Sequence, residues 1–430
     1  MSRMLRVLSA SIETNGRAGK RVLLFSFSVA FLIYVAATNS SRVTENAWLV
    51  GEWLISYEGG FHRRGLAGSA ILAVSDLTGA GPLWVVFVIQ VLLLLGLLVL
   101  LYIKLTSQPM PLGILVALFN PIAFTYFLVD PGGVAGRKEY ALFLIAVLWF
   151  NFQSKNLQSS KVGIKNGISL LFFAIGFGAL VLTHEGLSFF LPLLVIPWLL
   201  AWISGEKLSR NWILPSVLTL VIPTVSALAA ILVLSSNPSY EQLCDPLTSR
   251  LIPERICEGG IYVSVNSFVS GLEYSLSQTA AFVPGYGLYF AVGAGCLIVS
   301  YLALRCLPSM QSGIRPTYYA PLALVFLVAL SIPLYVIAVD WGRFISISAT
   351  LISLGLLFSY SKPESRGGES LRHLAWEWPS PKFKNRMLLS LAMIWFFFGV
   401  RHFAGDYLSI AYTWAATAYT WAAQIYLALR

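Results

Sequence analysis

Residues 82–103 read PLWVVFVIQVLLLLGLLVLLYI and contain no charged side chain. A helix rises about 1.5 Å per residue, so a stretch of this length matches a hydrocarbon core of roughly 30 Å. Lipid offers the backbone no hydrogen-bond partners, so such a segment crosses it as a helix. The stretch therefore predicts a transmembrane helix, and similar apolar stretches recur from residue 22 to residue 403.

The composition indicates a membrane protein that is helical throughout. Of the 430 residues, 57% are hydrophobic and 11% are charged, and the mean hydropathy is +0.75. A transmembrane β-barrel would alternate polar and apolar residues, whereas the apolar runs of this chain are continuous. We therefore expect an all-α, polytopic bundle of about 11 or 12 transmembrane helices that forms a single domain over residues 1–430.

Basic residues orient these helices. With the N-terminus in the cytoplasm, cytoplasmic segments receive 19 of the 29 Lys and Arg residues, as the positive-inside rule favours. This topology, in a bacterial inner membrane, gives periplasmic loops at 39–81 and 235–284 and a cytoplasmic loop at 362–386. The predicted spans are 22–38, 82–103, 112–129, 140–153, 167–183, 187–203, 212–234, 285–304, 319–338, 344–360 and 387–403, and 407–429 is left open between a twelfth span and an interfacial helix.

The net charge and the cysteines fit the same topology. The formal charge of +10 indicates no nucleic-acid partner, because most basic residues lie in short loops beside the lipid bilayer. Residues 22–38 lack a cleavage site and are expected to remain as the first helix. Cys244 and Cys257 share the large periplasmic loop, so we expect a disulfide between them, with two unpaired thiols as the alternative.

Four short polar segments on the predicted outer side form the candidate functional site, because ionisable groups near membrane depth are costly. In the first, Arg63 and Arg64 lie between glycines beside His62, and arginine forks match phosphate oxygens. In the second, Arg137 and Lys138 precede a helix whose positive end would favour an anion. The alternatives are binding to lipid headgroups for the first pair and neutralisation by a neighbouring carboxylate for the second.

The third and fourth segments carry carboxylates suited to acid–base chemistry. His184 and Glu185 join two helices with almost no loop, and Glu185 is a candidate general base, unless it only hydrogen-bonds between helices. In the fourth segment Arg343 would hold a phosphate and Asp340 would orient it or the acceptor, unless the two simply pair. Trp341 offers a flat face for a sugar ring. All four segments face one compartment, so we expect one shared site for an amphiphile with a phosphate head.

At these residues the chain resembles bacterial polysaccharide polymerases of the Wzy (O-antigen) type and, more loosely, GT-C-like glycosyltransferases with polyprenyl-linked donors. The resemblance rests on segments 60–66, 184–185 and 340–343 and on the span pattern. It implies transfer of a lipopolysaccharide glycan between undecaprenyl pyrophosphate carriers, with a polyprenyl-linked saccharide as substrate and a chain-length regulator or flippase as partner. The candidate catalytic residues are Glu185, His184, Asp340 and Glu58, and the candidate substrate-binding residues are Arg63, Arg64, Arg137, Lys138, Arg343, His62 and Trp341.

No cofactor is expected, since the sequence has no dinucleotide-binding fingerprint, and its four histidines form no metal motif. The nearest alternative is a transferase that takes one sugar from a polyprenyl monophosphate, using Glu45, Glu52 or Glu58 of the first outer loop. A lipid or solute transporter is an alternative of another class, although charges at mid-span are nearly absent. In a further alternative, an assembly subunit, the polar segments would only hold helices together.

Overall fold

The computed structural model describes residues 47–107, 112–119, 137–157, 163–204, 208–236, 238–265, 314–337 and 340–359, with scattered residues at 24–32, 123–127 and 273–301. Within these residues all regular structure is helical, which confirms the predicted all-α class. The segments 22–38, 285–304, 362–386, 387–403 and 407–429, for which we made predictions, lie wholly or largely outside the described residues.

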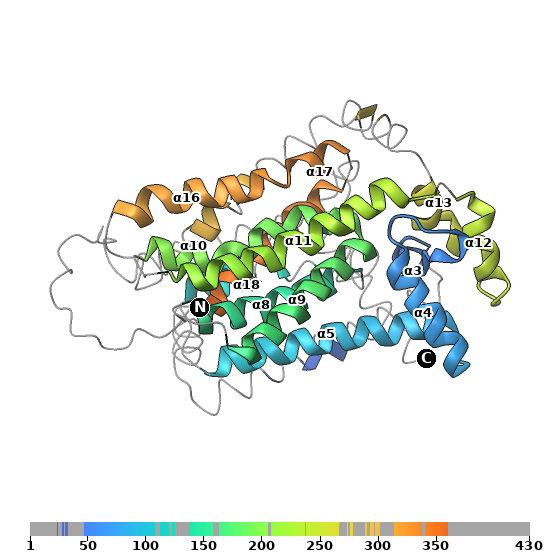
Figure 1. Ribbon diagram of the computed structural model, residues 1–430, viewed down its shortest axis with the longest axis horizontal. Helices are drawn as coiled ribbons and strands as arrows, with labels where there is room; N and C mark the ends of the chain where they lie inside the picture. The colour runs from blue at the N-terminus through green and yellow to red at the C-terminus, as the bar shows by residue number, and fades with distance from the viewer. Residues whose placement is uncertain are drawn as a thin grey trace, which may run out of the picture.

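Five of the described helices are long and apolar enough to cross a membrane, in agreement with a polytopic membrane protein. They are α5 (Pro82–Ser107), α9 (Ile164–Thr183), the continuous helix Glu185–Ile203, α11 (Arg210–Leu234) and α18 (Trp341–Ser359). The helix α8 (Glu139–Asn156) covers the span predicted at 140–153. Figure 1 shows these helices side by side, with their axes close to parallel.

Two predicted spans are less regular than expected. The span predicted at 187–203 starts as a 3₁₀ helix, η2 (Glu185–Val195), and continues as α10 (Ile196–Ile203). The span predicted at 319–338 is divided into α16 (Ile314–Ala329) and α17 (Ile332–Ile337). Proline has no N–H to donate, so Pro192 interferes with α-helical bonding inside η2, whereas Pro333 suits the first turn of a new helix.

The central helix of the bundle is α18. Every residue from Gly342 to Phe358 is buried, and the helix packs against α8, α10, η2 and α6 (Leu112–Phe119). In contrast, α11 lies at the periphery and buries a single stripe, which faces α9 and consists of Trp212, Ser216, Leu220, Ala227 and Ile231. The other faces of α11 expose Leu and Val side chains, as expected of a helix that contacts lipid.

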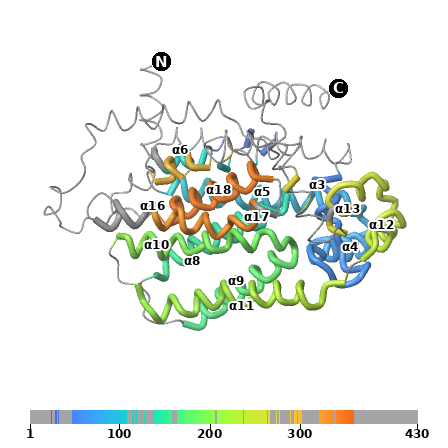
Figure 2. Tube along the Cα trace, turned by 90° about the horizontal axis from the view of Figure 1, so that it is seen from above, coloured from blue at the N-terminus to red at the C-terminus, as the bar shows by residue number. Residues whose placement is uncertain are grey.

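Six short helices form a cap at one end of the bundle, on the right in Figures 1 and 2. They come from the two predicted periplasmic loops and are α3 (Ala47–Leu54), η1 (Tyr57–Gly59), α4 (Gly65–Thr78), α12 (Tyr240–Thr248), η3 (Glu254–Glu258) and α13 (Gly260–Val265). The cap has its own hydrophobic core, which includes Trp53, Ile71, Leu247 and Ile256. The two loops therefore fold together as one unit.

Three contacts hold the cap together: the first lies within the second loop, and the other two join the second loop to the first. Cys244 and Cys257 form the predicted disulfide, with Cα atoms 5.9 Å apart. Arg250 donates to both oxygens of Glu58 at 2.8–2.9 Å and to both oxygens of Asp76 at 2.8–3.0 Å. Gly260 packs directly on Glu52, because a Cβ at this position would lie 2.7 Å from Glu52 Cγ. The second loop thus fixes the place of Glu52 in the first.

Candidate functional site

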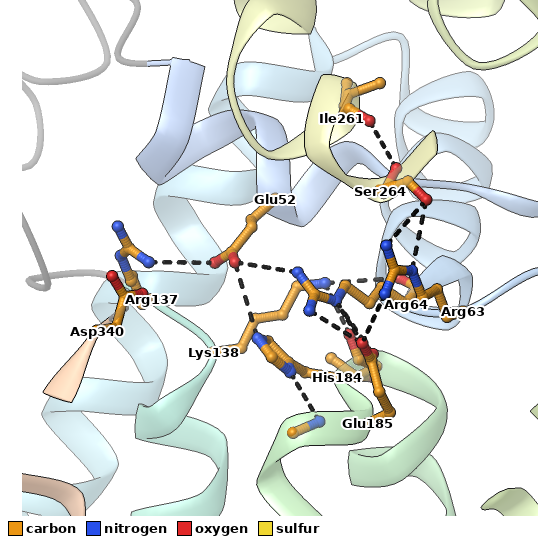
Figure 3. Close-up of polar contacts among 12 residues, drawn as sticks. Glu52, Arg63, Arg64, Arg137, Lys138, His184, Glu185, Ile261, Ser264 and Asp340 are labelled. Carbon is orange, nitrogen blue, oxygen red and sulfur yellow. Dashed lines mark hydrogen bonds and ion pairs between the residues drawn. The ribbon is translucent and has the colours of Figure 1, made fainter. Parts of the chain in front are cut away.

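The four polar segments meet where the cap joins the bundle (Figure 3). Arg64 lies just before α4, Lys138 just before α8, His184 between α9 and η2, and Arg343 in the first turn of α18. Helix ends from distant parts of the sequence therefore place their charges in one region. We call this group the ion cluster, and it consists of Glu52, Arg63, Arg64, Arg137, Lys138, Glu139, His184, Glu185, Asp340 and Arg343.

Glu52 is the carboxylate at the centre of the ion cluster. Its Oε1 lies 3.6 Å from a guanidinium nitrogen of Arg64 and 3.7 Å from His184 Nε2. Its Oε2 lies 3.8 Å from Arg137 and 4.0 Å from Arg343, and this buried oxygen accepts no hydrogen bond from the described residues. Glu52 is thus surrounded by positive groups, while Oε2 keeps its lone pairs.

These charges keep Glu52 ionised. Burial alone would raise its pKa, but the positive charges of Arg343 and Arg137 outweigh burial and hold the pKa of Glu52 well below the ordinary value. An ionised carboxylate with an oxygen that accepts no hydrogen bond can take a proton from a hydroxyl group. An anion that paired with the surrounding cations would raise this pKa and so strengthen Glu52 as a base.

The other carboxylates of the ion cluster each make a closer contact with an arginine than Glu52 does, although Glu139 Oε2 is also buried and accepts no hydrogen bond from the described residues. Both oxygens of Glu185 accept hydrogen bonds from Arg64 Nε at 3.0 Å, and Oε1 accepts a further one from Arg64 Nη2 at 2.9 Å. Glu139 forms a close ion pair with Arg343, whose guanidinium also lies 3.2 Å from Asp340. Arg64 and Arg343 are therefore each paired with a carboxylate. The contact between Asp340 and Arg343 matches the alternative stated for the fourth segment, in which these two residues simply pair with each other.

The edges of the ion cluster are partly exposed, whereas its centre is buried. The side chains of Arg63, Asp340 and Glu185 are 27%, 26% and 21% exposed, whereas Lys138 is completely buried. Arg63 Nη1 lies 3.7 Å from Glu185, and the same guanidinium donates to the backbone carbonyl of Ser264 on α13. A polar ligand that approaches from solvent would therefore meet Arg63 and Glu185 before the central carboxylate.

Two residues predicted to bind or react, Lys138 and His184, also make contacts that position their neighbours. Lys138 Nζ donates to the carbonyl of Thr183 at 2.8 Å, at the end of α9, and burial lowers the pKa of Lys138 to about 7. His184 Nδ1 accepts from the N–H of Gly186 at 3.1 Å, so the ring proton is on Nε2, which faces Glu52. Lys138 and His184 thus fix the backbone and the orientation of the central carboxylate.

The charges within the ion cluster nearly balance. Five side chains are Lys or Arg and four are carboxylates, which leaves one positive charge when Lys138 is protonated and His184 is neutral, and no net charge when Lys138 is also neutral. An arrangement of this kind can accept one phosphodiester with little excess charge. Among the described residues, no three His, Cys, Asp or Glu side chains gather as metal ligands would.

Three predicted site residues lie outside the ion cluster. Glu58 is on the cap surface and pairs with Arg250. Trp341 donates its indole N–H to the carbonyl of Tyr335 at 2.7 Å and packs against that ring, so it is engaged at the junction of α17 and α18. His62 adjoins Arg63 but makes no ion pair with the described part of the chain, and its Nδ1 lies 2.9 Å from the carbonyl of Gly60.

The sequence named Glu52 only as one of three candidate acids of the alternative transferase, and it gave a carboxylate beside Arg137 and Lys138 only as a local neutraliser. Glu139 neutralises Arg343, which is 204 positions away in the chain, rather than its neighbours Arg137 and Lys138. A signal for Glu52 was present, because it is the only charge in α3, AWLVGEWL, and a lone carboxylate in an apolar helix needs partners. The contact with Ser264 had no sequence signal, since it involves a backbone carbonyl.

Comparison with known families adds a family assignment. The family model described as "Uncharacterised membrane protein Rv1490" matches residues 20–276, more than half of the chain. The chain belongs to this family. The matched region contains the whole cap and eight of the ten residues of the ion cluster; Asp340 and Arg343 lie beyond it. No curated protein and no solved structure matches the chain.

Proposed function

We propose that this membrane protein is a glycosyltransferase that takes its sugar from a polyprenyl-phosphate carrier. The observation that carries the proposal is the position of Glu52, an ionised buried carboxylate inside a ring of cations, with one oxygen that accepts no hydrogen bond from the described residues. Transfer of a sugar from a lipid phosphate needs both a base and positive groups. A base must take the proton of the acceptor hydroxyl, and positive groups must stabilise the phosphate that leaves.

In the proposed reaction the acceptor hydroxyl oxygen attacks the anomeric carbon of the donor sugar. The bond between that carbon and the phosphate oxygen breaks, the hydroxyl proton passes to Glu52, and polyprenyl phosphate leaves with the bonding electron pair. Arg63 is the cation most open to the phosphate, and Arg64 lies behind it. Glu185 positions Arg64 and is not the base in this scheme.

The charge of the ion cluster favours a monophosphate donor. A sugar joined to polyprenyl phosphate is a phosphodiester with one negative charge, which matches the single excess positive charge that the ion cluster carries when Lys138 is protonated. Arg250, an arginine of the large predicted periplasmic loop, is paired with Glu58 and Asp76 and so is engaged within the cap. The polymerase predicted from the sequence is the second candidate, and it is favoured by the gathering of five cations from three separate hairpins, enough for a pyrophosphate.

The test replaces the proposed base. We expect Glu52→Gln to lower sugar transfer about 10²- to 10⁴-fold, the range for loss of a general base. Glu258→Gln makes the same change on an exposed part of the cap and serves as the control. The readout is the surface glycan pattern of a deletion strain that carries each variant, together with the melting temperature of each purified protein.

The glycan pattern separates the candidates. Loss of one sugar from an otherwise complete glycan supports the monophosphate transferase, whereas loss of the long-chain ladder with single repeat units retained supports the polymerase. A normal pattern in the deletion strain contradicts both. If Glu52→Gln retains transfer but melts far below the control, the ion cluster only holds the helices together.

A further inference from the structure

Two buried polar atoms lie in the turn between η1 and α4 and have no hydrogen-bond partner among the described residues. They are Tyr57 Oη and His62 Nε2. The His62 residue is only 2% exposed. A buried polar atom without a partner costs about 1–3 kcal/mol, so two in one turn call for an explanation.

The same turn holds both rings firmly. His62 Nδ1 lies 2.9 Å from the Gly60 carbonyl, and Gly60 supplies the positive φ of 108° that the turn requires. The Tyr57 ring fills the space beside Gly65, where a Cβ would come within 2.1 Å of it. The two rings meet edge to face, with centroids 6.2 Å apart. Their polar atoms are therefore set by the fold.

The contact with Gly60 decides what His62 can bind. A carbonyl only accepts hydrogen bonds, so Nδ1 carries the ring proton and Nε2 presents a lone pair. Burial lowers the pKa of His62, which keeps the ring in this neutral form at pH 7. An ionised phosphate has no proton to donate to Nε2. The pyrophosphate-binding role predicted for His62 from the sequence is therefore unsuited to this ring, which needs a ligand that donates.

The turn lies beside the ion cluster. Arg63, the next residue, is 3.7 Å from Glu185, and Arg64 follows it into the cluster. His62 is also close enough to Glu185 and Lys138 to be influenced by their charges. If a ligand bound with its phosphate against the cations of the ion cluster, the group attached to that phosphate would therefore lie near Tyr57 and His62.

We propose that Tyr57 and His62 form a subsite for a hydroxyl group of the sugar on a polyprenyl phosphate. The sugar hydroxyl donates to His62 Nε2, and the Tyr57 hydroxyl donates to an oxygen of the same sugar. This inference rests on the proposed function, because it names the group that the carrier presents. It adds a sugar-recognition element to a site otherwise built for phosphate.

The experiment measures binding of three lipids to the purified full-length protein in nanodiscs. The probes are undecaprenyl phosphate and its glucosyl and mannosyl phosphodiesters. The variants are Tyr57→Phe, which removes one oxygen atom, and His62→Gln, and Tyr240→Phe elsewhere in the cap is the matched control. We expect the wild-type protein to bind at least one glycolipid more tightly than undecaprenyl phosphate. Tyr57→Phe should weaken that glycolipid about 10-fold, as loss of one hydrogen bond would, and leave undecaprenyl phosphate unchanged.

Several outcomes would overturn the subsite. Equal binding of all three lipids by the wild-type protein would do so, and so would glycolipid binding in both Tyr57→Phe and His62→Gln that equals that of the control. An equal loss of all three lipids in Tyr57→Phe would assign Tyr57 a structural role. If the wild-type protein binds undecaprenyl phosphate but neither glycolipid, the sugar subsite is contradicted and the proposed function is not. If it binds none of the lipids, the proposed function fails with it.

Discussion

Carboxylates in the ion cluster differ in how they are held, and this difference assigns their roles. Glu185 accepts hydrogen bonds from Arg64 at 2.9–3.0 Å, whereas the four groups around Glu52 stay at 3.6–4.0 Å. Charge-assisted hydrogen bonds at the shorter distance fix both partners. Glu185 therefore orients an arginine, and Glu52 keeps the freedom to exchange a proton. Sequence spacing alone could not distinguish them, because both look like single acids beside apolar helices.

Lys138 gives a residue-scale prediction about pH. Its pKa is about 7 in the fold against an ordinary value of 10.5, because burial disfavours the charged form. Between these values the unfolded chain binds more protons than the folded protein, so stability rises with pH in that window. We expect the melting temperature of wild-type protein in detergent to rise more from pH 7 to pH 9 than that of Lys138→Gln. Equal slopes would mean that Lys138 stays charged in the fold.

At the scale of elements, Gln153 joins three helices near the end of the bundle opposite the cap. Its Oε1 accepts from the indole N–H groups of Trp198 on α10 and Trp212 on α11, at 3.0 and 2.8 Å, and its amide nitrogen contacts Ser216 at 3.1 Å. Gln153→Leu would leave both indole donors buried without partners, at a cost of about 1–3 kcal/mol each. We expect a clear fall in melting temperature.

The control for this prediction is Ser154→Ala on the same helix. Among the described residues, the Ser154 hydroxyl donates to the carbonyl of Phe150, four residues earlier on the same helix, so its loss should change the melting temperature little. A Gln153→Leu protein that melts with the control would show that the two indoles find other acceptors.

The sequence predicts a helix correctly where the length of a continuous apolar run is enough to define it. The run at 82–103 became α5 and the run at 212–234 became α11, each extended by a few residues at its ends. The division between α16 and α17 was not predicted, because the whole stretch is apolar. Hydropathy measures only how apolar the stretch is, and it does not depend on whether a residue such as Pro333 lacks a backbone N–H. The cap was missed for another reason: its short helices are stabilised by contacts between two loops, which local sequence does not encode.

For the whole molecule, the cap should behave as a unit fastened by Arg250. Arg250→Ala removes the ion pairs to Glu58 and Asp76 but leaves the core of the cap and the bundle intact. We expect protease to cleave α12 and η3 severalfold faster in the variant, with little change in the melting of the bundle. Arg255→Ala, an exposed arginine of the same loop, is the control. Equal cleavage of the two variants would show that the ion pairs of Arg250 do not fasten the second loop to the first.

The orientation of the molecule decides which compartment the ion cluster faces. The polar segments gather at the cap end, and Lys155 lies near the other end of α8, 16 positions after Glu139. Arg63 is the most exposed cation of the ion cluster, so a thiol at its position would be open to solvent. In a background with Cys296→Ser and Cys306→Ser, we expect an impermeant maleimide to label Arg63→Cys in intact cells and Lys155→Cys only after permeabilisation.

The labelling pattern tests the proposed substrate as well as the topology. Outside labelling of Arg63→Cys would place the ion cluster where polyprenyl-linked sugars are used after they cross the membrane. The reverse pattern would place the cap and its disulfide in the cytoplasm, where thiols are kept reduced. Such a result would contradict the positive-inside assignment and would remove the periplasmic saccharide as the substrate, since the ion cluster would then face the opposite leaflet.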